Sequence, residues 1–135
     1  SKGLEWDHVV VPRLVEGELP STPRDGMVGW LGLGVLPYEL RGDAAELPVF
    51  DWRGAESRKE LLQRREAFGL AVGEHLEREE RRLAYVAVTR ARHRLLLTGS
   101  FWASQVKPRG PSPYLRELAE HGVIAPPPDA PANDE

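Results

Sequence analysis

The chain has 135 residues, enough for one hydrophobic core, and its 18 basic and 21 acidic side chains give a net charge of −3. This charge excludes an overall electrostatic attraction to nucleic acid, so any contact with DNA must come from local arginines. The absence of cysteine excludes disulfides and thiolate metal sites, and the 4 histidines lack ligand spacing, so no metal site is expected. Without a membrane-spanning apolar run or a signal peptide, the sequence predicts a soluble, cytoplasmic protein with no membrane partner.

The first predicted element is a strand at residues 8–11, a histidine followed by three valines. An uninterrupted β-branched run is typical of a strand that is covered on both faces inside a parallel sheet. Pro12 ends it, because proline cannot donate a ladder hydrogen bond.

Residues 14–54 follow as an irregular insert, rich in glycine and proline, that leaves no room for a long helix. Residues 29–33 are expected to form one turn or to pack as an extended apolar strip. Glycines 29, 32 and 34 are not a dinucleotide fingerprint, because Pro37 stands where the third glycine of that motif would fall. The large apolar side chains of the insert are expected to cover the sheet as core: Trp30, Leu31, Leu33, Leu36, Phe50 and Trp52.

A helix is predicted between residues 55 and 89, where proline is absent and leucines recur at helical offsets. We expect a break or kink near residues 69–73, because two glycines lie there. The charged run at residues 57–66 is expected to be a solvated face, and contact of Arg64 and Arg65 with DNA is the less favoured alternative.

Arg90 lies where this helix gives way to a second predicted strand, residues 94–98. An arginine on such a corner is carried by two rigid elements and can hold its planar guanidinium against a phosphate. The alternative is that Arg90 satisfies the helix's last carbonyls or meets a surface acid, and spacing alone leaves both open.

The last predicted element is a short helix at residues 112–120. Ser112 suits the N-cap, Pro113 the first helical position and Gly122 the stop. Residues 125–135, rich in proline and acidic at the end, are expected to be a disordered tail or a linker.

Two strings carry a family resemblance. Residues 81–91, Arg-Arg-Leu-Ala-Tyr-Val-Ala-Val-Thr-Arg-Ala, resemble motif VI of superfamily 1 DNA helicases of the UvrD, Rep and PcrA group. Residues 2–12, Lys-Gly-Leu-Glu-Trp-Asp-His-Val-Val-Val-Pro, resemble motif V of the same helicases. The two motifs follow one another along the chain in the order in which they occur in that family. Less specifically, Trp102 and the string at residues 108–113 resemble actinobacterial helicases of this class.

The resemblance implies an α/β fold: a partial RecA-like α/β/α domain of the P-loop NTPase type, with a short, mainly parallel sheet and a long helix before the motif VI strand. Residues 1–124 would be the C-terminal portion of the second RecA-like domain, with 14–54 as its insert and 125–135 as the tail. Because the sequence begins inside motif V, we expect a piece of a longer polypeptide.

The resemblance also implies the site residues. Arg90 would be the catalytic arginine that reaches the γ-phosphoryl group of ATP, with Gly3 and Glu5 beside the same nucleotide. Lys2 and Arg92 would contact DNA or further phosphate oxygens. Without the resemblance, a tight turn at Gly3 and a surface acid at Glu5 are the simpler interpretation.

The implied function is ATP-dependent DNA unwinding in DNA repair or recombination, with ATP and Mg²⁺ bound between two RecA-like domains. The sequence contains no G-x-x-x-x-G-K-[ST], so the fragment alone is expected to bind no nucleotide and to be inactive. Expected partners are single-stranded and duplex DNA, the first RecA-like domain, and a nuclease domain or second subunit. The alternative is a non-catalytic, helicase-derived module that acts in protein interaction.

Overall fold

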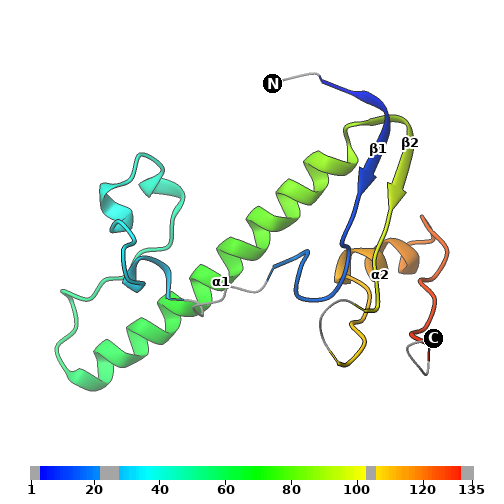
Figure 1. The fold of residues 1–135 in the computed structure, drawn as a ribbon. Helices are drawn as coiled ribbons and strands as arrows, with labels where there is room; N and C mark the ends of the chain where they lie inside the picture. Colours follow the sequence, from blue (N-terminus) through cyan, green and yellow to red (C-terminus); the bar gives the residue numbers. More distant parts are fainter. Residues whose placement is uncertain (1–3, 22–27, 103–105, 132–135) are drawn as a thin grey trace. The chain divides into compact units, whose positions relative to one another are not determined.

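The computed structural model describes residues 4–21, 28–102 and 106–131. In chain order these ranges contain strand β1 (Trp6–Val11), three 3-10 turns (Gly29–Leu31, Tyr38–Leu40 and Ala44–Glu46), helix α1 (Arg58–Val88), strand β2 (Ala91–Leu97) and helix α2 (Pro113–Glu120), as Figure 1 shows. The chain divides into two compact units. Ser1–Thr22 with Glu80–Glu135 form one, here called the sheet unit, and Pro23–Glu79 form the other, the insert unit.

The sheet unit is built on a parallel pair of strands, β1 and β2. Val11 lies opposite Leu97, and Trp6 lies opposite Ala91 after a register irregularity near the start of β1. The Trp6 amide donates to the Arg90 carbonyl at 2.9 Å, which extends the pairing to the residue before β2. The prediction of two strands in a parallel sheet is therefore confirmed.

The prediction that β1 is covered on both faces is wrong for the described residues. Val10 is 57% exposed and Leu96 on β2 is 56% exposed. Successive side chains of a strand point to opposite faces, and only the other face carries a core. That core consists of Val11, Leu14 and Leu115, with Val9, Leu19, Ala87, Val88, Leu97 and Ile124 packed against it.

The terminal helix forms as predicted. Ser112 is fully buried at the N-cap, where its hydroxyl accepts from the Tyr114 amide at 3.2 Å and donates to the Leu19 carbonyl. Pro113 occupies the first helical position, and Gly122 follows the helix with φ of 70°. A left-handed residue just past the last turn is the usual helix stop.

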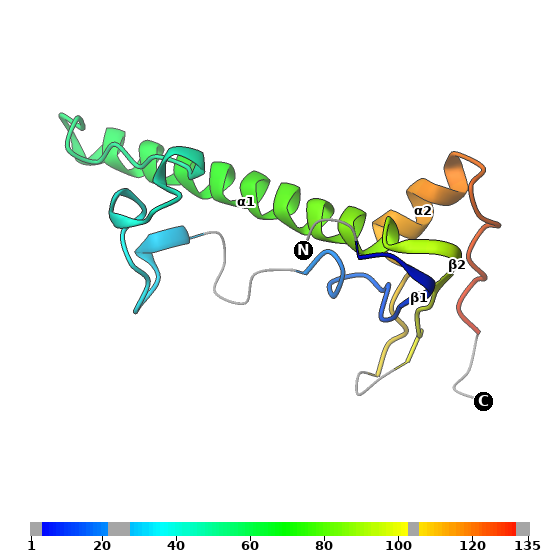
Figure 2. The same cartoon turned by 90° about the horizontal axis from the view of Figure 1, so that it is seen from above.

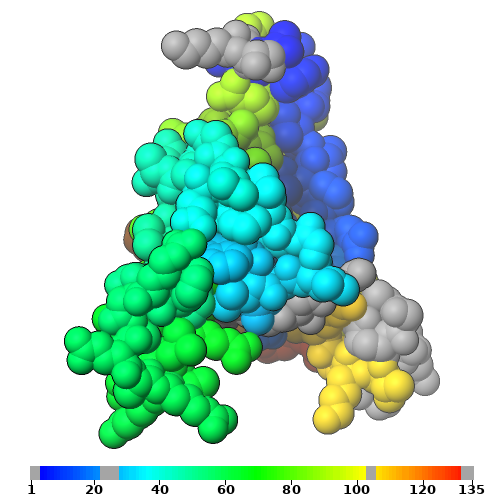
Figure 3. Space-filling view, turned by 90° about the vertical axis from the view of Figure 1, so that its left-hand side faces the viewer, coloured from blue at the N-terminus to red at the C-terminus, as the bar shows by residue number. Residues whose placement is uncertain are grey.

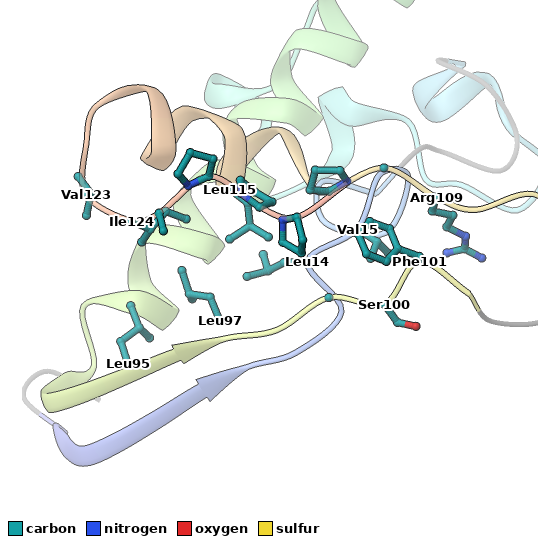
Figure 4. Close-up of a pocket in the computed structure, with 17 residues that line it drawn as sticks. Leu14, Val15, Leu95, Leu97, Ser100, Phe101, Arg109, Leu115, Val123 and Ile124 are labelled. Carbon is teal, nitrogen blue, oxygen red and sulfur yellow. The ribbon is translucent and has the colours of Figure 1, made fainter. Parts of the chain in front are cut away.

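A cavity of about 550 Å³ lies between β2 and the segment that follows α2. Figure 4 shows Leu95 and Leu97 on one side and Val123 and Ile124 on the other. The prolines at 126–128 also line it, so this part of the predicted tail borders the sheet unit. Residues 125–131 contain no helix or strand.

Helix α1 is continuous over 31 residues, and Figures 1 and 2 show it without interruption. The predicted break near residues 69–73 is therefore wrong. Each glycine in a helix interior costs roughly 1 kcal/mol relative to alanine. Phe68 and Val72, which flank these glycines, are the buried residues of the helix, and their packing offsets this cost.

In the insert unit, three aromatic rings pack around Phe68 of α1. The Phe50 ring stacks on it at 5.3 Å between centroids, and Trp30 and Tyr38 contact it at 6.4 and 6.1 Å. The segment that carries these rings is cyan in the space-filling view of Figure 3. The insert's aromatic side chains were predicted to cover the sheet, but their partner is α1, and Leu33 is fully exposed. The turn expected at 29–33 appears at Gly29–Leu31.

Arg64 of α1 binds the insert through an ion pair and a hydrogen bond. Its guanidinium contacts the carboxylates of Asp51 and Glu60, the latter at 2.7 Å, and donates to the Gly54 carbonyl at 3.0 Å. These partners give Arg64 a structural role, as the solvated-face interpretation expected. Nothing in these contacts supports DNA binding by Arg64.

The loop after β1 is held by Glu18, which lies between two arginines. Arg13 donates to both carboxylate oxygens, at 2.6 and 3.0 Å, and Arg109 donates to one of them. These hydrogen bonds, that from Arg13 foremost, hold the pKa of Glu18 below its ordinary value of 4.5. Glu18 thus ties the segment after β1 to the segment before α2.

We predict that Gly29→Ala destabilises the insert unit by about 2–4 kcal/mol, from the positive φ and from overpacking. Gly29 has φ of 54°, and an added Cβ would lie 2.9 Å from both Phe68 and Val72. Gly34→Ala is the matched control, because its φ is 79° but nothing lies within 4 Å. Urea unfolding should show a clearly larger loss for Gly29→Ala, and equal losses would contradict the packing.

We further predict that Glu18→Gln makes the unfolding free energy less dependent on acidic pH. A carboxylate whose pKa is lowered by folding stabilises the protein above its unfolded pKa, and this contribution disappears as the pH falls through the folded pKa. For Glu18 that window begins near pH 4.5 and extends below it. Chemical denaturation from pH 7 to pH 3 should show a shallower decline for Glu18→Gln than for the exposed control Glu16→Gln. An unchanged slope would contradict the double arginine contact.

Candidate functional site

The corner between α1 and β2 consists of only two residues, Thr89 and Arg90. Helix α1 ends at Val88 and β2 begins at Ala91. The Thr89 hydroxyl donates to the Tyr85 carbonyl at 2.8 Å, and its amide donates to the same carbonyl at 3.0 Å. Thr89 therefore completes the last helical turn and leaves Arg90 as the residue immediately before the strand.

The Arg90 side chain is held against both elements. Its Nε donates to the Val86 carbonyl at 3.2 Å, one Nη to the Leu4 carbonyl at 3.4 Å, and the other Nη to Thr89 Oγ1 at 3.4 Å. Leu4 lies just before β1, so the guanidinium bridges the two strings that the sequence singled out. The prediction that Arg90 lies between the helix and the second strand is confirmed.

Arg90 keeps an uncompensated charge within the described part of the chain, where no carboxylate forms an ion pair with it. A guanidinium has five N–H donors, and the three contacts above use three of them. The side chain is only partly buried. The alternative that Arg90 satisfies a helix carbonyl is therefore realised at Val86, but no surface acid in the described ranges is its partner.

The dipole of α1 does not favour an anion at this corner. The corner lies at the C-terminal end of α1, which carries partial negative charge and favours cations. An anion at this place gains nothing from the helix itself. Any affinity for phosphate must therefore come from the guanidinium of Arg90 and from neighbouring basic groups.

Glu5 lies beside the same corner, one residue after Leu4. Its carboxylate forms an ion pair with Arg92 across the two strands, at 3.5 Å between Oε2 and Nε. Both side chains are about half exposed. The structure thus brings Glu5, Arg90 and Arg92 together, but Arg92 already has an acidic partner. Lys2 and Gly3 lie outside the described residues.

Sequence reasoning missed some of the contacts at this end of the sheet. His93 approaches Asp7 at 3.6 Å, parallel to the Glu5–Arg92 pair. It also missed the hydrogen bonds of the Thr89 hydroxyl to the Tyr85 and Val86 carbonyls. The available signal was the strand register, because a parallel pairing of residues 6–11 with 91–97 brings Glu5 and Asp7 beside the start of the second strand, which carries Arg92 and His93.

Metal binding and membrane insertion find little support in the described ranges. Within residues 4–21, 28–102 and 106–131, no three histidine or acidic side chains gather as a metal site would require. In the same ranges, no helix combines the length and the apolar character needed to cross a bilayer.

Comparison with known protein families gives a match. The family model of the UvrD-like helicase C-terminal domain matches residues 1–100, which include both strings and the corner between α1 and β2. No curated protein matches the chain. The parallel strand pair and the long helix before β2 are those of a partial RecA-like domain. The chain therefore belongs to the UvrD-like helicase C-terminal domain family.

Proposed function

We propose that this chain is the C-terminal part of the second motor domain of an ATP-dependent DNA helicase that acts in DNA repair or recombination. In the full-length enzyme it would supply half of the ATP site, with the other half on the first RecA-like domain. It would also supply part of the track for single-stranded DNA. Duplex DNA, and a nuclease domain or second subunit, are further proposed partners.

One observation carries the proposal. Arg90 presents a partly exposed guanidinium that no described carboxylate neutralises, and it does so from a corner fixed by hydrogen bonds to Val86 and Leu4. A fixed, uncompensated cation with unused N–H donors is suited to a phosphate. The family match to the UvrD-like helicase C-terminal domain makes ATP the natural source of that phosphate.

Arg90 would act by donating its remaining N–H groups to oxygens of the γ-phosphoryl group. The charge on these oxygens changes as the phosphoryl group leaves, and a preorganised donor stabilises that state without rearrangement. Gly3 and Glu5 would lie along the nucleotide, where a carboxylate can accept from a ribose hydroxyl. Lys2 and Arg92 would contact DNA or a second phosphate, and Arg92 would exchange its Glu5 partner to do so.

The fragment is proposed to depend on the rest of the enzyme for turnover. Its sequence has no phosphate-binding loop with a lysine. Mg²⁺ would be held by carboxylates of the first domain, where it neutralises phosphate charge. This chain's own contribution is the guanidinium and the strand edge beside it.

A second candidate is a non-catalytic, helicase-derived module that docks onto a partner protein. The exposed apolar side chains of the sheet, Val10 and Leu96 among them, favour it. Under that proposal the full-length protein would show no ATP hydrolysis stimulated by single-stranded DNA.

We predict that Arg90→Lys in the full-length protein lowers kcat of ATP hydrolysis about 10³-fold or more, the range for loss of an arginine that stabilises phosphoryl transfer. Lysine keeps the charge but lacks the planar fork, so nucleotide binding should weaken much less. Steady-state hydrolysis with saturating single-stranded DNA, together with nucleotide binding by fluorescence, would measure both.

Arg116→Lys is the control for Arg90→Lys, because Arg116 lies on α2 and, among the residues that the structure describes, forms only a long ion pair, to Glu16 at 3.9 Å. It should keep normal turnover. Near-normal kcat in Arg90→Lys would contradict the assignment of Arg90. Absence of hydrolysis in the unmodified full-length protein would instead favour the docking module.

A further inference from the structure

The strongest unexplained contact of the sheet unit joins α2 to the end of α1. Arg81 Nη1 donates to both carboxylate oxygens of Glu117, each at 2.9 Å. The same guanidinium lies over the Tyr114 ring, with Cζ 5.3 Å from the centroid. Helix α2 lies outside the residues that match the family model. A segment beyond the family match therefore contacts α1, the helix whose end leads into the corner with Arg90.

The interface between the two helices is partly open. Arg81, Ala84, Tyr85 and Val88 form one stripe of α1, at the spacing of residues that share a helix face. This stripe and α2 line a groove of about 430 Å³. Because the groove leaves part of the interface unfilled, apolar packing alone does not fix the separation of the helices. The Arg81–Glu117 contact spans this interface directly.

The other end of α2 is fixed to the loop after β1. Buried Ser112 donates its amide to the Leu14 carbonyl at 3.0 Å and its hydroxyl to the Leu19 carbonyl. Val15 and Pro111 form an antiparallel bridge in the same place. Helix α2 therefore acts as a brace, anchored on the β1 loop at its start and on α1 through Glu117.

Movement of α1 at Arg81 would be transmitted to the corner. Arg90 is bound to the last turn through the Val86 carbonyl, so its guanidinium moves with that turn. Its contact with the Leu4 carbonyl, at 3.4 Å, depends on the same position. A small tilt of the end of α1 would displace the guanidinium relative to β1.

We propose that Glu117, acting through Arg81, is a positioning residue for the guanidinium of Arg90. The inference rests on the proposed function. Both members of the pair are about half exposed, and exposed ion pairs contribute little to folding stability. We therefore expect loss of the Arg81–Glu117 pair to lower the rate of ATP hydrolysis more than the folding stability. A misplacement of a catalytic group by about 1 Å can cost up to about 10²-fold in rate.

The test uses the full-length helicase with ATP and single-stranded DNA. Glu117→Gln should lower kcat by about 5- to 50-fold, with KM for ATP within about 2-fold and an unchanged melting temperature. Glu117→Asp, which keeps the charge, should recover part of the lost rate. Glu120→Gln, an exposed acid of the same helix, is the matched control and should leave kcat unchanged.

A double-mutant cycle tests whether Glu117 acts through Arg90. In the Arg90→Lys background, Glu117→Gln should cause little further loss, because the group that it positions is already missing. An additive loss would overturn the proposal. So would a fall in melting temperature that accounts for the lost rate, because Glu117 would then be only structural.

The two proposals fail in different ways. Impaired Arg90→Lys with normal Glu117→Gln overturns the positioning role alone. Normal turnover in Arg90→Lys overturns the proposed function, and the positioning role with it.

Discussion

The sheet unit depends on the parallel pairing of β1 with β2. This pairing brings the segment before residue 11 beside the segment after residue 90, with Val11 opposite Leu97. It fixes the Leu4 carbonyl within reach of the Arg90 guanidinium and Glu5 within reach of Arg92. Parallel strands need a long crossover, and here α1 supplies the part that returns to the sheet. The site follows from that single topological constraint.

Much of this arrangement could be predicted from local patterns. The valines before Pro12 and the leucines after Arg94 predicted two strands, because β-branched and apolar runs bounded by breakers are strong local signals. Ser112, Pro113 and Gly122 predicted the terminal helix through its capping chemistry, which needs no distant partner. The Arg90 corner followed from the helix and strand on either side of it.

The remaining features depend on contacts distant in sequence. Helix α1 stays continuous past two glycines beside the buried Phe68 and Val72, and rings from the insert pack on Phe68. Glu18 and Arg109 are separated by 91 residues, and no sequence spacing indicates that pair. The exposure of Val10 could not be predicted either, since an apolar run indicates burial without revealing how many faces of the sheet are covered.

The central claim is that Arg90 completes a phosphate site whose other wall lies on the first RecA-like domain. It is tested most directly by a crystal structure of the full-length helicase with single-stranded DNA and a non-hydrolysable ATP analogue. The account predicts an Arg90 Nη atom about 2.7–2.9 Å from a γ-phosphate oxygen, the distance of a charge-assisted hydrogen bond. A closed, nucleotide-bound complex in which Arg90 contacts only carbonyls of its own domain, with the phosphate out of reach, would contradict it.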